Sequence, residues 1–462
     1  MKKVLLLNPP GDQFYLRDYF CSKVSKSGYL YHPTDLLVLS GILSPHFEVH
    51  VMDAIVERVS YQQAVRRIEA LAPDYCIFIT GSVSFSLDMA FLKMLLRHVP
   101  SIKKVVGIGD VFFNRQRELL ERHSDLDAIV VDFTTDDIVH YLRGEPCENI
   151  VFRDGNSIEG SWTKSRHGVF SYPVPRYDLF PNRKYHYPFT REHPFGVILT
   201  NFGCPFQCSF CIMPALGFKT REPENVLEEL AWLKKHGFRN VYFNDQTFGA
   251  DKRRTKQLLQ GMIDRGLGLG FVAFTRVDVL EETLLDLMQA AGCHTVMFGI
   301  ESADPTLLIR YGKGITLERV REVVEGCHRR RIRTLGTFIL GLPGETRKSA
   351  LSTIAFAKDI PLDYAAFNIA IPRMGTQLRE QAIREKLVDA DVEEMDQSGS
   401  EAVIRNQDLS LAEIEALKRR AYREFYFRPT KLAAKLMDIR TREDLCNHVR
   451  NGWGVFAGLW RK

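Results

Sequence analysis

Residues 204–211 read Cys-Pro-Phe-Gln-Cys-Ser-Phe-Cys, and this stretch decides how the rest of the chain is interpreted. It directly follows a short apolar run, 196–200, which we predict to be a buried strand. Three thiolates this close together can ligate one soft-metal centre. In an iron–sulfur cube, which normally takes four cysteines, three ligands would leave one iron open. The alternatives are a structural zinc site, although no second cysteine pair follows, and three core cysteines.

The residues from 195 onward alternate between strand and helix patterns. Helices are expected between the strands, for example over 222–236 and 317–330. The expected strands are 196–200, 240–244, 270–274, 295–300, 334–340 and 365–371. Such a series predicts a parallel barrel or most of one, a partial (β/α)6 fold, with its active site at the carboxyl ends of the strands.

The first part of the chain also alternates short apolar strands with helices. Strands are expected at 3–7, 47–52, 75–80, 104–108 and 128–131, and helices at 61–71, 87–99 and 136–142. This pattern predicts an α/β, Rossmann-like parallel sheet that is covered on both faces. Ligands of such sheets bind at the carboxyl ends of the strands, which here carry Asn8, Asp53, Gly81-Ser82 and Gly109-Asp110.

Four segments follow from this reading. We expect a Rossmann-like domain at 1–145, an ordered linker rich in proline and aromatic residues at 146–194, the partial barrel at 195–384, and a C-terminal helical extension at 385–462. Within the extension, helices are expected over 409–427 and, after Pro429, over 430–437.

The composition is that of a soluble globular protein. Of 462 residues, 45% are hydrophobic and 26% charged, and a net charge of +5 over this length gives no reason to expect a nucleic-acid partner. We find no signal-peptide pattern and no apolar run long enough for a transmembrane helix. The nine cysteines are therefore expected in a reducing, cytoplasmic setting, where clustered cysteines favour metal binding or catalysis.

The cysteine stretch resembles the CxxxCxxC signature of the radical SAM superfamily, in particular its subgroup with an N-terminal cobalamin-binding domain. That subgroup includes methyltransferases and the anaerobic magnesium-protoporphyrin ester cyclase. Further segments that agree with it follow later strands: 242–248, 275–278, 298–302, 341–345 and 371–376. Because each segment comes at the carboxyl end of an expected strand, all of them could face one cavity.

The resemblance implies a [4Fe–4S] cluster held by Cys204, Cys208 and Cys211, with S-adenosylmethionine (SAM) on the open iron. The residues it implies for SAM binding are Phe210, Ile212, Asp245, Arg276, Glu301, Gly341 and Gly344. Glu301 would accept from the ribose hydroxyls and Arg276 would bind the carboxylate. Alternatively, Arg276 pairs with Asp278, Glu301 has a capping role, and Asp245 serves the substrate. The two glycines permit a tight turn or a close backbone approach.

The resemblance also implies cobalamin in the N-terminal domain. The residues it implies there are Asn8, Pro9, Asp53, Gly81, Ser82, Ser84, Gly109 and Asp110. The turns after the fourth and fifth strands, 107–112 and 131–136, depart from the family pattern. A domain that binds no cobalamin therefore stays an alternative.

The function expected from the resemblance is cleavage of SAM to a 5′-deoxyadenosyl radical and methylation of an unactivated carbon. A cyclising or oxidative reaction on a porphyrin- or lipid-like substrate, a radical SAM enzyme without cobalamin, and a cobalamin or iron–sulfur sensor are the alternatives. The implied partners are a small-molecule, lipid or tetrapyrrole substrate and an electron donor such as flavodoxin or ferredoxin.

Overall fold

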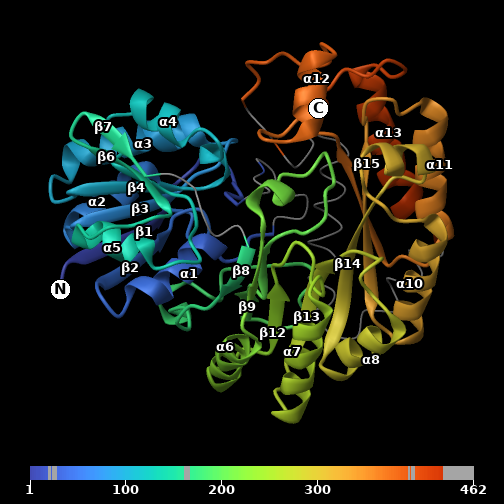
Figure 1. Ribbon diagram of the computed structural model, residues 1–462, viewed down its shortest axis with the longest axis horizontal. Coiled ribbons are helices and arrows are strands. Elements are labelled where there is room, and N and C mark those ends of the chain that lie inside the picture. Colours follow the sequence, from blue (N-terminus) through green and yellow to red (C-terminus); the bar gives the residue numbers. More distant parts are fainter. Residues whose placement is uncertain (19–21, 23–28, 161–166, 394–395, 397–400, 430–462) are drawn as a thin grey trace. The chain divides into compact units, whose positions relative to one another are not determined.

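The chain folds into two compact units. The computed structural model describes residues 1–18, 22, 29–160, 167–393, 396 and 401–429 (Figure 1). The first unit is built mainly from Leu30–His186 with the N-terminal residues, and the second mainly from Tyr187–Val392 with later residues. No helix among the described residues is long and apolar enough to cross a membrane.

The first unit contains the expected Rossmann-like sheet, with strand order β2-β1-β3-β4-β5-β6-β7. Its parallel strands are β1 (Lys3–Asn8), β2 (Glu48–Asp53), β3 (Tyr75–Ile79), β4 (Lys104–Ile108) and β5 (Ala128–Val130). The sequence order reverses between β1 and β3, and ligands of open α/β sheets bind at the carboxyl ends of the strands beside such a point.

Two further strands extend this sheet within residues 146–194, the segment expected to be an ordered linker. These are β6 (Ile150–Asp154) and β7 (Ser157–Glu159), which add to β5 in antiparallel fashion. The sequence analysis did not indicate these two strands, which are joined by the tight turn Gly155-Asn156 of a hairpin.

Five helices cover the sheet, and the sequence analysis missed two of them. The helices are α1 (Thr34–Leu43), α2 (Tyr61–Leu71), α3 (Phe85–His98), α4 (Gln116–Arg122) and α5 (Asp137–Arg143). Helix α2 matches the expected range, and its first residues are fixed by a capping box between Ser60 and Gln63. Helices α1 and α4 were not expected, and every residue of α1 is buried.

The second unit contains a six-stranded parallel sheet, which confirms the expected partial barrel. Its order, β16-β15-β14-β13-β12-β9, follows the chain without a break. The strands are β9 (Phe195–Ile198), β12 (Asn240–Phe243), β13 (Gly270–Thr275), β14 (Cys293–Glu301), β15 (Arg333–Leu340) and β16 (Tyr364–Ile369). All six lie within two residues of the expected strands at each end.

Helices connect these strands and line one side of the sheet in Figure 1. They are α6 (Pro223–Lys235), α7 (Lys252–Asp264), α8 (Glu282–Ala290), α9 (Pro305–Arg310), α10 (Leu317–Arg329) and α11 (Arg347–Asp359). Parallel neighbours require such crossovers, so every loop that leaves a strand begins at the same edge of the sheet.

Two helices end the described part of the chain. Helix α12 (Gln377–Arg384) follows β16, and α13 (Leu411–Tyr426) matches the expected helix 409–427. The hydroxyl of Tyr426 donates to the carbonyl of Ala365 at 2.8 Å and that of Tyr422 accepts from the amide of Phe367 at 3.2 Å. Helix α13 therefore covers the edge of β16 that, among the described residues, pairs with no other strand. The expected helix 430–437 lies outside the described residues.

Gly109, at the end of β4, allows a direct test of this geometry. Its φ is +139°, and a Cβ there would collide with the backbone carbonyl of Thr80. We expect Gly109→Ala to lower the free energy of unfolding by more than about 2 kcal/mol, measured by urea denaturation of the full chain.

Gly155→Ala is the matched control, because Gly155 also has a positive φ, +56°, but nothing lies within 4 Å of a Cβ there. This substitution should cost only about 1 kcal/mol. Equal losses for both variants would contradict the close approach of Gly109 to Thr80.

Candidate functional site

The three cysteines of the motif lie in a loop that a short antiparallel pair holds in place. Strand β10 (Asn201–Gly203) pairs with β11 (Phe218–Arg221). The motif therefore follows β10, whereas the sequence predicts that it directly follows the strand that is β9. The amide of Cys204 donates to the carbonyl of Gly217 at 2.9 Å, and that of Cys211 donates to the carbonyl of Cys208 at 3.0 Å. Cys208 is buried and Cys204 is half-buried.

All three thiols are free of disulfide bonds. Burial raises the pKa of the Cys211 thiol to about 12, and the nearby charges of Cys204 and Cys208 act in the same direction. Yet no three His, Cys, Asp or Glu side chains in the described part of the chain are grouped so that they could hold a metal ion. The donor chemistry thus fits a cluster with three protein ligands, whereas the thiols are not gathered around one point.

Arg276, at the carboxyl end of β13, contacts the motif. Its Nη1 donates to Cys208 Sγ at 3.2 Å, and its guanidinium lies 3.9 Å from the ring centre of Phe206. It also makes two hydrogen bonds of 2.9 Å to Asp278, which is the alternative pairing expected from the sequence. Burial raises the pKa of Cys208, and the positive charges of Lys313 and Arg276 oppose that increase.

A buried ion pair continues this arrangement. Glu301 ends β14 with a φ of +71° and accepts from Lys313 Nζ at 2.8 Å; the side chains are only 10% and 6% exposed. Gly299 leaves room for the pair, since a Cβ there would collide with both groups. The N-terminus of α9, the helix that follows β14, is capped by Asp304 and not by Glu301.

Lys313 is the functional candidate that the sequence analysis missed. Besides its bond to Glu301, its backbone carbonyl accepts a hydrogen bond from Arg276. A continuous series of contacts therefore runs from Cys208 through Arg276 and Lys313 to Glu301. The available signal was a lysine between two glycines, Gly312 and Gly314, shortly after a strand that ends in a carboxylate.

Asp245 accepts hydrogen bonds from the turn between β9 and β10. Its carboxylate accepts from the backbone amides of Thr200 and Asn201 at 2.7 and 3.1 Å and from the Thr200 hydroxyl. Burial raises its pKa to about 6, and these hydrogen bonds oppose that increase. Because both carboxylate oxygens are engaged within the chain, Asp245 fixes the turn that leads into the cysteine loop.

The remaining candidates of the second unit frame the same edge. Ile212 is buried, and Phe210 packs against an apolar cluster that includes Tyr311 and Leu342. Gly341 and Gly344 have φ values of +82° and +88°. The amide of Gly341 donates to Glu345, so both glycines serve a tight turn around this buried carboxylate.

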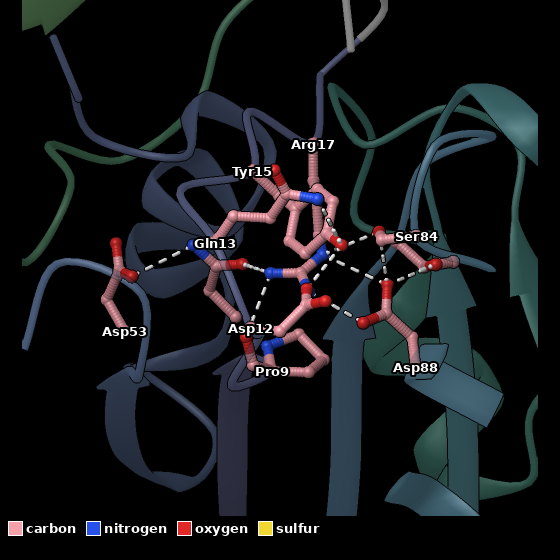
Figure 2. Close-up of polar contacts among 10 residues, drawn as sticks. Pro9, Asp12, Gln13, Tyr15, Arg17, Asp53, Ser84 and Asp88 are labelled. Carbon is pink, nitrogen blue, oxygen red and sulfur yellow. Dashed lines mark hydrogen bonds and ion pairs between the residues drawn. The ribbon is translucent and has the colours of Figure 1, made fainter. Parts of the chain in front are cut away.

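The carboxyl edge of the first unit is polar and tightly hydrogen-bonded (Figure 2). Arg17 and Asp88 form an ion pair of 2.6 Å with side chains 1% and 0% exposed. Arg17 also donates to Asn8 Oδ1 at 2.7 Å, to the Pro9 carbonyl at 2.8 Å and to the Ser84 hydroxyl at 3.0 Å. Asn8, Pro9 and Ser84 are candidates that the sequence predicts here, whereas neither member of the ion pair is.

The other candidates lie at the same carboxyl edge of the sheet. Asp53 accepts from Asn8 Nδ2 and from the Tyr185 hydroxyl, each at 2.9 Å. Asp110 accepts from the amide and the hydroxyl of Ser82, each at 3.0 Å. The Gly81 carbonyl accepts from the Ser84 amide, and Gly109 packs against Thr80. All eight candidates thus lie at the carboxyl ends of β1 to β4.

Cys208→Ala tests the cysteine assignment. We expect iron bound after anaerobic reconstitution to fall from about four atoms per chain to fewer than about one, because only two thiolates would remain. Cys147→Ser, which changes a half-buried cysteine of the first unit, should keep the iron content of the unchanged protein. Full iron content in Cys208→Ala, with an unchanged circular dichroism spectrum, would refute the assignment.

Asp53 should make the stability of the apo protein depend on pH. Burial raises its pKa from 3.8 to about 6, so the folded state holds this proton more tightly than the unfolded chain. The resulting stabilisation is complete below pH 3.8 and is lost as the pH rises through 6, a change of about 3 kcal/mol.

Asp53→Asn keeps an acceptor for Asn8 and removes the titration. Its free energy of unfolding should therefore fall less between about pH 4 and pH 7 than that of the unchanged protein, as measured by urea denaturation. Identical pH profiles for both proteins would show that Asp53 does not titrate in this range.

Comparisons with known proteins agree with this geometry. Residues 198–357 match the model of the Radical SAM superfamily. The chain is 30% identical over 450 residues to an uncharacterized methyltransferase of Pyrococcus horikoshii, covering 94% of this chain and 95% of that protein. It is 25% identical to the anaerobic magnesium-protoporphyrin IX monomethyl ester cyclase of Cereibacter sphaeroides, over 79% of this chain and 59% of the cyclase.

The fold is also shared with a solved structure, the radical S-adenosylmethionine methyltransferase TsrM from Kitasatospora setae with cobalamin and a [4Fe-4S] cluster bound. The TM-score is 0.67 at 20% identity, covering 83% of this chain and 78% of TsrM. The superfamily match spans β9 to α11, the part of the second unit that carries the cysteine loop, Arg276, Glu301 and Lys313. This chain belongs to the radical SAM superfamily.

Proposed function

We propose that this protein is a cobalamin-dependent radical SAM enzyme that methylates an unactivated carbon. The observation that carries the proposal is the series of contacts from Cys208 through Arg276 and Lys313 to Glu301 at the carboxyl edge of the partial barrel. A SAM-binding site needs a cation for the amino-acid carboxylate and an anion for the ribose hydroxyls close to the cluster ligands. This edge supplies both charges within one connected group.

Each residue of this edge has a defined task in the proposal. Cys204, Cys208 and Cys211 hold the [4Fe–4S] cluster, and Lys313 and Arg276 bind the carboxylate of SAM. Glu301 accepts hydrogen bonds from the ribose, with Lys313 keeping its charge compensated. The bound groups supply reductive cleavage of SAM to the 5′-deoxyadenosyl radical and a methyl group carried by cobalamin. A flavodoxin or ferredoxin would deliver the electron.

Cobalamin belongs to the first unit in this proposal. The carboxyl edge beside the β1–β3 reversal carries backbone and hydroxyl groups at Pro9, Gly81 and Ser82 and a carboxylate at Asp110, which form hydrogen bonds within the chain. These groups suit a ligand that is bound through hydrogen bonds rather than through a protein–cobalt bond. The fold shared with TsrM, whose structure contains cobalamin, supports the assignment.

The similarity to the cyclase favours a second candidate, a ring-closing reaction on a tetrapyrrole. Both candidates share the SAM site and differ in whether a methyl group is transferred. A sensor without turnover would have no use for the buried Lys313–Glu301 pair, which is costly to form unless its charges serve a ligand.

The test uses the full chain, reconstituted with iron and sulfide and reduced under anaerobic conditions. Incubated with SAM and hydroxocobalamin, it should form 5′-deoxyadenosine, S-adenosylhomocysteine and a methylcobalamin absorbance band. Without 5′-deoxyadenosine the radical function fails. If 5′-deoxyadenosine forms but neither methylcobalamin nor S-adenosylhomocysteine appears, the methyltransferase proposal fails and the cyclase candidate is favoured.

Lys313→Met tests the SAM site itself. Loss of a charged hydrogen bond should weaken SAM binding roughly 10- to 100-fold, measured by equilibrium dialysis, with iron content unchanged. Lys313→Arg should recover part of the affinity. Lys252→Met, which breaks an exposed pair with Glu281, is the matched control and should bind SAM as the unchanged protein does. Equal SAM affinity in Lys313→Met and Lys252→Met would exclude Lys313 from the site.

A further inference from the structure

One buried carboxyl group in the first unit has an oxygen without a partner. Asp35 lies in the first turn of α1 and is 3% exposed, and it is the sole ionisable residue of that helix. Its Oδ2 is buried and makes no hydrogen bond. Leaving such an atom unpaired costs about 1–3 kcal/mol, so a purely structural role does not account for an aspartate at this position.

The surroundings of Asp35 place it at the candidate cobalamin edge. Helix α1 follows β1, so its first turn lies at the carboxyl edge of the sheet. Two other carboxylates are near enough to interact with it: Asp110, after β4, and Asp18. Asp110 accepts two hydrogen bonds from Ser82 and Asp18 accepts one from Tyr31, whereas Oδ2 of Asp35 has none.

The charge state of Asp35 limits the kind of ligand. Burial raises its pKa to about 8, and the negative charges of Asp18 and Asp110 add to the increase. Near pH 7 the group is therefore mostly neutral, so that it can both donate one O–H and accept. Two flanking carboxylates disfavour an anion, and no metal-binding group of three side chains exists among the described residues. A neutral group that both donates and accepts is the complementary ligand.

We infer that Asp35 binds a carboxamide on the periphery of the corrin ring of cobalamin. A carboxylic acid and a primary amide form two hydrogen bonds with each other and bury no net charge. The inference rests on the proposed function and adds a specific contact residue that the sequence did not indicate. In the bound protein, the amide satisfies the oxygen that is unpaired without ligand.

Two measurements test the inference. One is the binding of hydroxocobalamin to the full chain, followed by absorbance, and the other is the thermal stability of the cobalamin-free protein. Asp35→Leu should bind about 10- to 100-fold more weakly, because a corrin amide is left buried without a partner. The same substitution should leave the melting temperature unchanged or raise it, since an unpaired polar atom is replaced by an apolar side chain of similar size.

Asp35→Asn keeps a donor and an acceptor and should bind within about threefold of the unchanged protein. The control is Asp127→Asn, which changes a half-buried carboxylate that accepts from the Val105 amide at the opposite edge of the sheet; it should not alter cobalamin affinity. Unchanged affinity in Asp35→Leu, or a lowered melting temperature that accompanies any loss, would overturn the inference. If the unchanged protein binds no hydroxocobalamin, the cobalamin part of the proposed function fails, and this contact fails with it.

Discussion

Parallel pairing of the six strands from β9 to β16 is the constraint on which the candidate SAM site depends. Because neighbouring strands run the same way, every strand ends at one edge, and residues far apart in the chain meet there. The bond from Arg276 to Cys208 spans 68 residues, that from Arg276 to Lys313 spans 37, and that from Lys313 to Glu301 spans 12. A slip of one residue in any strand would turn these side chains away from each other.

The two edges handle buried charge differently. At the barrel edge two anions face cations, Glu301 with Lys313 and Asp278 with Arg276, while Asp245 and Glu345 accept from backbone amides. At the edge of the first unit, Arg17 compensates Asp88, and Asp53 and Asp110 accept from hydroxyl groups, while Asp35 has one oxygen without a hydrogen bond. The barrel edge suits a charged, zwitterionic ligand, and the edge of the first unit suits a neutral ligand rich in amides.

The sequence predicts features that are local in the chain, and it misses those that depend on packing. The barrel strands are apolar runs with clear ends, so they and their terminal residues Asp245, Arg276 and Glu301 could be located. Helix α1 could not, because it is buried on every side and shows no polar face. Arg17 and Asp88 are 71 residues apart, and nothing local marks either as the partner of the other.

The complete burial of α1 bears on how the first unit could be studied alone. The backbone of residues 173–175 lies directly against Gly41, and the Ser40 hydroxyl accepts from the Arg176 amide at 3.0 Å. His32, which precedes the helix, packs against Tyr185, with the two ring centres 4.0 Å apart and the ring planes tilted by 33°. A fragment that ended at residue 145 would strip this cover and expose apolar surface, which promotes aggregation. The stretch up to His186 is therefore part of the same folding unit, and a soluble N-terminal fragment has to include it.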